Sequence, residues 1–375
     1  MEQKIKVLMV VFNLSVANGV SSFVMNYFRK LDHNTIIMDF VVYQDVETPY
    51  KKEILQAGGK IHVIPSIKNI RQHIKESKKV IIDGQYDIIH DNILILSYFV
   101  MHYAKKYNVP VRILHSHNAK LGATQFKEIR NGLFMPFLLR EANTYFACSQ
   151  LAAKCMFGNK PYTFIPNIVS SKNLKFNPHV RERMRKEGAV NNKKVILTVG
   201  RLDLQKNPFY AIDVICCIHE FRDDILYWWI GDGKLEKEVR LYIEQKHAEK
   251  FICLLGRKEN VADYYQAADL FFLPSKFEGL PVTGVEAQAM GLLCFVSDAI
   301  TRQFIYTDLV KTFSVKNSPE NTARIFAEWL ISIPLDRDRT KYIKFLEGSQ
   351  FCDWKAGQFL ETVYKKLFKL RQYHN

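Results

Sequence analysis

The chain alternates short apolar runs with stretches of helical length, and it does so in two successive series. The apolar runs are rich in Val, Ile, Leu and Met without a polar–apolar alternation, as in residues 6–13 and 194–199. Continuous runs of this kind are typical of strands buried on both faces in a parallel sheet. Strands that alternate with helices of about 10–15 residues indicate βαβ units. The sequence therefore predicts an α/β protein with parallel sheets.

The expected elements follow from this alternation. In the first series we expect strands at 6–13, 38–43, 60–64, 87–90, 111–115, 145–148 and 163–165, and helices at 19–31, 49–57, 67–84 and 93–107. In the second we expect strands at 194–199, 225–230, 252–255, 270–273 and 294–296, and helices at 209–220, 234–246, 261–267 and 282–290.

Two domains of similar size follow from the restart of the pattern. Residues 171–192 are polar and charged and contain Pro178 and Gly188, so we expect a linker there. This predicts an N-terminal domain at 1–170 and a C-terminal domain at 193–354. Residues 355–375 have apolar positions near helical spacing and predict a final helix that packs back on the N-terminal domain.

Composition narrows the protein class and its compartment. The chain of 375 residues is 48% hydrophobic and 24% charged, as in globular proteins. It has no run of 18 apolar residues, and its N-terminus runs straight into an apolar segment that we interpret as a first strand, not a secretion signal. Its seven cysteines form no C-x-x-C pair, which favours a reducing, cytoplasmic location and argues against a zinc site.

Positive charge is concentrated in the first half. The net charge is +15, and residues 1–175 hold 23 Lys and Arg against 12 Asp and Glu. Nucleic acid, an anionic membrane or a phosphate-bearing substrate would each explain such an excess. Composition alone does not choose among them.

Residues 273–298 form the most informative segment, with a strand, a loop and a helix in succession. Proline is favoured at the first helical turn, so Pro281 predicts a helix start there. The amides of Val282, Thr283 and Gly284 would then be free to bind an anion such as phosphate. Glu278 precedes this start, and Glu286 follows one turn later. Each glutamate also has an ordinary interpretation, Glu278 as a charge that meets the helix dipole and Glu286 as a surface residue.

Two further loops follow strands. In residues 198–208 (TVGRLDLQKNP), Arg201 and Lys206 are cations suited to the oxygens of a diphosphate, or simply solvated loop charges. In residues 10–22, Gly19 begins a helix where the backbone could approach a ligand. Neither this loop nor Gly231-Asp232-Gly233 completes the G-x-G-x-x-G dinucleotide pattern.

Three histidines, His90, His115 and His117, come at the ends of strands. Ligands of α/β sheets bind at that edge, although a histidine there is often a hydrogen-bonded structural residue. His-x-His could also bind a metal, but no third ligand has a fitting spacing.

The chain resembles the retaining glycosyltransferases of the group 1 family (family 4), which have the GT-B architecture. The resemblance rests on GRLDLQKNP at 200–208, IGDGKLEKEV at 230–239, LLGRKENVADYYQAADLFFLPSKFEGLPVTGVEAQAMG at 254–291 and HSHN at 115–118. The E-x7-E pair of the family falls on Glu278 and Glu286. The first loop departs from the pattern, since Asn18-Gly19 stands where Gly-Gly is usual, and Ser21 or Ser22 where many members have glutamate.

The resemblance implies two Rossmann-like parallel-sheet domains that face each other across a cleft, with a nucleotide-diphosphate sugar held mostly by the C-terminal domain. Arg201 and Lys206 would neutralise the leaving diphosphate, and the segment Gly279 to Thr283, with Leu280 and Val282, would hold its phosphates. Glu286 would bind the ribose, and Glu278 the donor sugar. Arg257 and Lys258 match the edge that binds the base, and Gly19 the first loop. His115 matches the histidine beside the reacting carbon, with His117 a near rival, and His90, His117 and Asn118 would lie on the acceptor side.

The resemblance further implies retention of configuration, a donor that is commonly UDP-linked and no need for a metal or other cofactor. We expect a saccharide acceptor, lipid-linked, in the synthesis of a cell-surface polysaccharide such as exopolysaccharide or capsule. The basic N-terminal half, with Ile67–Lys79 and several aromatic residues, suggests peripheral contact with an anionic membrane on the cytoplasmic side. A nucleotide-sugar epimerase of the same architecture and a non-enzymatic protein that binds membrane or nucleic acid are the alternatives. No nucleic-acid-binding motif is present, so we expect no nucleic-acid partner.

Overall fold

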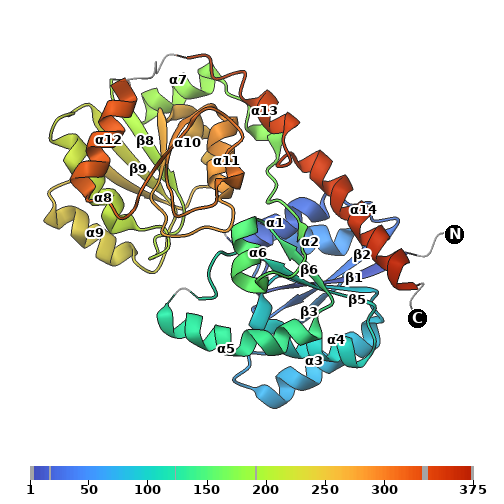
Figure 1. Cartoon of the computed structure of the whole chain (residues 1–375). Coiled ribbons are helices and arrows are strands. Elements are labelled where there is room, and N and C mark those ends of the chain that lie inside the picture. Colours follow the sequence, from blue (N-terminus) through green and yellow to red (C-terminus); the bar gives the residue numbers. More distant parts are fainter. Residues whose placement is uncertain (1–3, 17, 123, 191, 332–336, 373–375) are drawn as a thin grey trace. The chain divides into compact units, whose positions relative to one another are not determined.

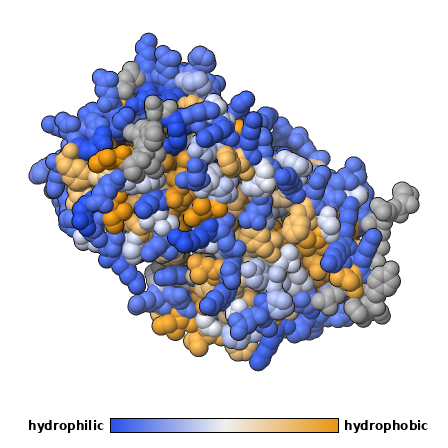
Figure 2. All heavy atoms as spheres, turned by 45° about the horizontal axis from the view of Figure 1, so that its top comes forward, coloured by the Kyte–Doolittle hydropathy of each residue, from blue (hydrophilic) through white to orange (hydrophobic). Residues whose placement is uncertain are grey.

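The computed structural model describes residues 4–16, 18–122, 124–190, 192–331 and 337–372, with side chains through residue 370. By its internal contacts the chain divides into two units (Figure 1). Unit 1 comprises residues 1–168 and 353–375, and unit 2 comprises residues 169–352. On the face that Figure 2 presents, hydrophilic side chains predominate, with hydrophobic ones between them.

Unit 1 is built on a parallel sheet of seven strands in the order β3-β2-β1-β4-β5-β6-β7. Nearly every residue of β1 is buried, as the apolar sequence predicts. The strands are β1 (Ile5–Val11), β2 (Ile36–Val42), β3 (Ile61–Val63), β4 (Ile88–Asp91), β5 (Val111–Ser116), β6 (Thr144–Ala147) and β7 (Thr163–Phe164).

Helices cover this sheet, and one of them comes from the far end of the chain. Residues of α1, α2 and α14 share a buried apolar core with β1 and β2, and α4 packs against both α3 and α5 (Figure 1). The helices are α1 (Gly19–Phe28), α2 (Pro49–Gln56), α3 (Ile70–Gly84), η1 (Leu94–Ser97), α4 (Tyr98–Lys106), α5 (Gln125–Glu141), α6 (Gln150–Phe157) and α14 (Asp353–Gln372).

Unit 2 is built on a parallel sheet of six strands in the order β10-β9-β8-β11-β12-β13. Its main core lies between this sheet and α8, α9 and α12. The strands are β8 (Lys194–Val199), β9 (Ile225–Ile230), β10 (Ile252–Gly256), β11 (Leu270–Leu273), β12 (Leu293–Ser297) and β13 (Val310–Phe313). The helices are η2 (Ser171–Asn173), α7 (Pro178–Glu187), α8 (Pro208–His219), α9 (Glu236–Gln245), α10 (Val261–Ala267), α11 (Val282–Ala289), η3 (Arg302–Phe304), α12 (Pro319–Ile331) and α13 (Ile343–Gly348).

The expected parallel α/β architecture is thus present in both units. Sequence patterning missed α5, α6, α12, α13 and β13. The C-terminal helix, expected at 355–375, is α14, and its contacts with α1 lie within unit 1.

Residues 171–192, expected as a linker, are instead part of unit 2. They contain α7, which packs against α10. Arg185 is buried, and its guanidinium donates to the carbonyl oxygen of Ala267 at 2.9 Å and pairs with Asp269 at 3.1 Å. Two of the charges that made this segment look like a solvated linker, Arg181 and Arg185, therefore attach it to Asp269, the residue before β11.

Strand order brings particular loops together. In each sheet the chain reverses its direction of strand addition once, between β1 and β4 in unit 1 and between β8 and β11 in unit 2. In parallel sheets, ligands bind beyond the carboxyl ends of the strands at this point of reversal. The two reversals locate the candidate sites.

Candidate functional site

A buried ion pair forms at the reversal point of unit 2. The loop after β8 carries Lys206, the loop after β11 carries Glu278, and their Nζ and Oε1 atoms lie 2.6 Å apart. The side chains are only 13% and 10% exposed. Gln205 donates from Nε2 to the other oxygen of Glu278 at 3.1 Å, so both carboxylate oxygens are bonded. Two residues that the sequence predicted separately therefore act as one unit.

Arg201 lies in the same loop but remains exposed. Its guanidinium is 66% exposed and lies 3.1 Å from Asp203 Oδ2. The other oxygen of Asp203 accepts the amides of Gln205 and Lys206 at 3.0 and 3.1 Å. Asp203 thereby shapes the loop, and the exposed guanidinium of Arg201 remains accessible to an anionic ligand.

The start of α11 has no side-chain cap, so that its first backbone amides are available to a ligand. Pro281 precedes the helix as its N-cap residue, and no side chain caps the start. The amide of Gly284 donates to the carbonyl oxygen of Pro281 at 3.0 Å, so the expectation that it is free is wrong. Val282 and Thr283 remain the positions whose amides have no intrahelical acceptor.

Two hydroxyls flank this helix start. Ser275 Oγ, in the loop after β11, and Thr283 Oγ1 are buried atoms without a hydrogen-bond partner among the described residues. Buried polar groups are rarely left in this state, because an unmade hydrogen bond costs about 1–3 kcal/mol. Both hydroxyls suit the oxygens of a bound anion.

Glu286 lies on α11, one turn beyond this start. The hydroxyl of Tyr265, on α10, donates to Glu286 Oε2 at 3.0 Å. Burial raises the pKa of Glu286 to about 7, and the Tyr265 hydrogen bond opposes this rise. A carboxyl group in this environment is suited to accept hydrogen bonds from paired hydroxyls.

The loops after β9 and β10 follow this site along the same sheet edge, since β9 adjoins β8 and β10 adjoins β9. Arg257 Nη2 pairs with Asp232 Oδ2 at 2.9 Å, and both side chains are exposed. The ammonium of Lys258 lies 6.0 Å from the ring centre of Tyr264. Gly231 has a φ of +131°, and a Cβ there would meet the carbonyl oxygen of Gly200. These loops therefore pack backbone against backbone.

In unit 1 the three strand-end histidines form one cluster. His90 Nε2 lies 2.9 Å from His115 Nδ1, and the rings of His115 and His117 are 4.1 Å apart. Burial lowers the pKa of His90 and of His117 to about 3, and that of His115 well below its ordinary value. All three imidazoles are therefore neutral near pH 7.

The remaining ring nitrogens distinguish His115 from His117. His117 Nε2 lies 2.8 Å from Asn92 Oδ1, so it donates to that oxygen. His115 Nε2 is buried and has no partner among the described residues. Asn118 is exposed, and its carbonyl oxygen accepts from Ser116. Within the described ranges, no three His, Cys, Asp or Glu side chains lie so as to hold a metal ion.

Gly19 begins α1, but the chain itself occupies much of this helix start. Asn18 Oδ1 accepts the amides of Val20 and Ser21 at 2.9 and 3.4 Å. A Cβ at Gly19 would meet no described atom within 4 Å. The replacement of a glycine by Asn18 thus produces a self-capped helix, and the N-terminal loop offers fewer free amides than α11 does.

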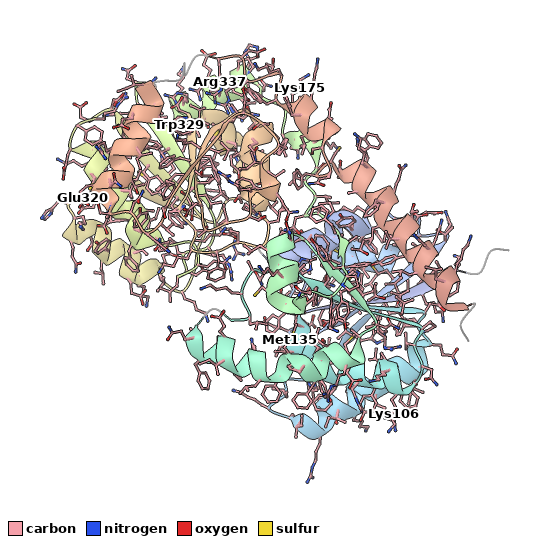
Figure 3. The ribbon with its side chains drawn as sticks, viewed as in Figure 1. Lys106, Met135, Lys175, Glu320, Trp329 and Arg337 are labelled. Atoms are coloured by element: carbon pink, nitrogen blue, oxygen red, sulfur yellow. The ribbon has the colours of Figure 1, made fainter. Side chains whose placement is uncertain are left out.

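Helix α5 exposes an apolar face with flanking cations. Phe126, Ile129, Leu133 and Phe137 are 54–76% exposed, and their spacing of three and four residues places them along one side of the helix. Met135 lies on the opposite side and is buried (Figure 3). Exposed cations on this helix and its neighbours include Arg71, Lys75, Lys105, Lys106, Lys127, Arg130 and Arg140. No helix in the described part of the chain is long and apolar enough to cross a membrane.

Sequence reasoning missed Asp203, Gln205, Ser275 and Tyr265. Asp203 could have been found locally, because an Asp side chain often accepts a hydrogen bond from the backbone amide two residues later in a loop. The other three carried none. Gln205 and Tyr265 act on residues 73 and 18 positions away along the chain, and Ser275 stands out only because its hydroxyl is buried without a partner among the described residues.

Comparisons with known proteins bear on the family and the fold. Residues 180–344 match the family model described as glycosyl transferases group 1. The putative glycosyltransferase EpsF of Bacillus subtilis is 29% identical over 302 residues, which cover 76% of this chain and 77% of EpsF. A UDP-Gal:alpha-D-GlcNAc-diphosphoundecaprenol alpha-1,3-galactosyltransferase of Escherichia coli is 36% identical over 140 residues, which are 36% of each chain.

Among solved structures, HepE from Anabaena, determined in complex with UDP, superposes with a TM-score of 0.76 at 14% identity. The match covers 97% of this chain and all of HepE. At this identity the likeness establishes the fold, which is GT-B with two Rossmann-like domains. Residues 180–344 are thus similar to the glycosyl transferases of group 1, and the chain as a whole has the GT-B fold.

Proposed function

We propose that the protein transfers a hexose from a UDP-sugar to a lipid-linked saccharide, with retention of configuration and without a metal ion, in the assembly of a cell-surface polysaccharide. The observation that carries the proposal is the reversal point of unit 2. There the loop that carries Arg201 and Lys206 meets the loop that carries Glu278, and the uncapped start of α11 follows that second loop in the chain.

These groups suit the charge that develops in the reaction. The bond between the anomeric carbon and the diphosphate oxygen breaks, and a bond from that carbon to an acceptor hydroxyl oxygen forms. The proton of the acceptor hydroxyl passes to solvent, and the diphosphate, a diester in the donor, leaves as a monoester with one additional negative charge. Arg201, Lys206 and the amides of Val282 and Thr283 would stabilise it, and such preorganised groups are worth about 10²–10³ in rate each. Because these groups supply positive charge, a divalent metal is not needed in this proposal.

The remaining contacts would orient the donor. Glu286 would accept the two ribose hydroxyls, Glu278 would face the sugar, and the loop at Arg257 and Lys258 would meet the base. Uracil is the base we propose, in keeping with the UDP-linked donor of the Escherichia coli relative and the UDP bound to HepE. His115 would contact the donor sugar, as the resemblance to the group 1 family implies.

Thermal shifts test the donor site directly. UDP, GDP, ADP and their sugars would be compared on the wild type, on Glu286→Gln and on Glu238→Gln, which alters an exposed glutamate of α9 in the same unit. A ligand at 100 times its Kd stabilises by about 2.7 kcal/mol. We expect UDP compounds to raise Tm in the wild type and in Glu238→Gln, but much less in Glu286→Gln. Equal shifts in all three proteins, or none, would contradict the proposal.

The stereochemistry and the metal requirement need the reaction itself. Retention predicts that the product linkage has the anomeric configuration of the donor sugar, which proton NMR of the product reads directly. Metal independence predicts the same rate before and after treatment with a chelator. An inverted linkage, or activity that is lost on chelation and restored by Mg²⁺, would refute the respective part.

We further propose that α5 rests on the cytoplasmic face of an anionic membrane, where the lipid-linked acceptor would be found. Phe126, Ile129, Leu133 and Phe137 would insert between headgroups, and the surrounding cations would meet anionic lipid. The acceptor of the Escherichia coli relative is a diphosphoundecaprenol-linked sugar, which supports a membrane-borne substrate.

Vesicle sedimentation tests this contact. We expect binding to vesicles that contain phosphatidylglycerol, weaker binding to phosphatidylcholine alone, and a loss of binding in Leu133→Ser. The control is Leu241→Ser on α9, since Leu241 is 57% exposed and Leu133 is 69% exposed. Equal binding by both variants would exclude α5 as the contact.

A further inference from the structure

A buried hydrogen-bonded chain connects the C-terminal helix to His115. Tyr364, on α14, places its hydroxyl oxygen 2.5 Å from His90 Nδ1, and His90 Nε2 lies 2.9 Å from His115 Nδ1. All three side chains have no exposed surface. The chain ends at His115 Nε2, which has no partner among the described residues. It lies wholly within unit 1.

The direction of this chain follows from the tyrosine proton. A neutral imidazole carries one N–H and one acceptor nitrogen, and a neutral phenol has one proton to donate. The hydroxyl of Tyr364 has His90 Nδ1 as its hydrogen-bond partner in the described structure. If His90 Nδ1 carried a proton, the tyrosine proton would be buried without an acceptor, at a considerable cost. Tyr364 therefore donates to His90 Nδ1.

The remaining protons are then determined. His90 carries its proton on Nε2 and donates it to His115 Nδ1, so His115 carries its own proton on Nε2. Burial raises the pKa of Tyr364 and lowers the pKa of both histidines, which keeps each group in the neutral form that this pattern requires. The open end of the chain is thus an N–H donor and not a lone pair.

We propose that Tyr364 is a positioning residue that, through His90, holds His115 as the tautomer with an N–H at Nε2, so that this histidine meets an acceptor oxygen of the substrate. This inference rests on the proposed function, in which His115 faces the reacting sugar. It assigns the C-terminal helix a part in the chemistry, because Tyr364 reaches the strand edge from a helix 249 residues beyond His115.

Nitrogen NMR of the protein with ¹⁵N-labelled histidine rings reads the tautomers without any substrate. Signals would be assigned from His90→Gln and His115→Gln variants. In the wild type we expect His90 and His115 both protonated at Nε2. In Tyr364→Phe we expect His115 to move toward the Nδ1-protonated form, while His117 stays unchanged because Asn92 holds it. Protonation of wild-type His115 at Nδ1 would overturn the proposal, as would an unchanged His115 in Tyr364→Phe.

Kinetics test whether the tautomer matters for transfer. Tyr27→Phe is a matched control, since Tyr27 is a buried tyrosine of the same unit whose hydroxyl donates to the carbonyl of Pro166. We expect Tyr364→Phe to lower kcat about three- to ten-fold at unchanged donor KM, the range of one neutral hydrogen bond, and Tyr27→Phe to leave both unchanged. In a His115→Ala background, Tyr364→Phe should have no further effect.

An additive loss in that double variant, or an equal loss in Tyr27→Phe, would show that Tyr364 is merely structural. Failure of every donor to support transfer would refute the proposed function and leave the NMR result standing. The two proposals can therefore fail separately.

Discussion

Glu286 should couple the binding of a UDP-sugar to the release of a proton. Burial raises its pKa to about 7, so near pH 6 most molecules hold it protonated before the ligand arrives. Ribose hydroxyls donate to a carboxylate, and binding therefore favours the ionised form. The affinity should rise as the pH increases through 7.

The magnitude follows from the raised pKa. At pH 6, one unit below it, about nine molecules in ten carry the proton, so affinity should be about tenfold weaker than its limit at high pH. Binding at pH 6 should release about 0.9 proton, and binding at pH 8 about 0.1. A carboxyl group with the ordinary pKa of 4.5 would show almost no change over this range.

The same shift governs stability in the opposite direction. Folding favours the protonated form of Glu286. Its contribution to the free energy of unfolding is therefore fully present below pH 4.5 and is lost as the pH rises toward 7. The difference amounts to about 3 kcal/mol at about 1.4 kcal/mol per pH unit. Glu286→Gln should therefore gain stability relative to the wild type at pH 8 but not at pH 4.

Isothermal titration at pH 6, 7 and 8 in two buffers of different ionisation enthalpy measures affinity and proton release together. A UDP-sugar is preferable to UDP, because its diphosphate diester does not titrate in this range. The Glu286→Gln variant is the control and should bind weakly with no pH dependence. A wild-type affinity that is the same at pH 6 and pH 8, or the same slope in the variant, would refute the assignment of Glu286.

Two pairs of substitutions test the packing of the site by thermal and chemical denaturation. Lys206→Met should lower the free energy of unfolding by about 3–5 kcal/mol, because it leaves the buried charge of Glu278 unpaired. Addition of Glu278→Gln should recover much of this loss; no recovery would show that Lys206 does not stabilise the protein through its pair with Glu278. Gly284→Ala should lower the free energy of unfolding by about 1–3 kcal/mol, because the new Cβ would lie 2.9 Å from the ring of Phe304. Gly19→Ala is the control and should be tolerated, because a Cβ there would meet nothing within 4 Å. Equal stability of the two alanine variants would contradict the close packing at Gly284.

Local sequence patterns predicted where the candidate loops lie, because each loop is defined by the strand before it and the helix after it. Arg201, Lys206, Glu278 and Glu286 could be selected in this way. Patterning failed where charged or apolar residues had unexpected surroundings. Arg185, within 171–192, is a buried partner of Ala267 and Asp269 in unit 2, and the exposed phenylalanines of α5 lie on a helix that patterning did not find.

By itself, the sequence determined the parallel α/β class and the positions of the loops that follow the strands, since apolar periodicity and turn residues are properties of neighbouring positions. The tertiary structure decided which of these loops meet. Strand order places β8 beside β11 and so pairs Lys206 with Glu278, and the return of α14 to unit 1 joins Tyr364 to the histidines. Such contacts depend on how whole elements pack, and no periodicity within one segment encodes them.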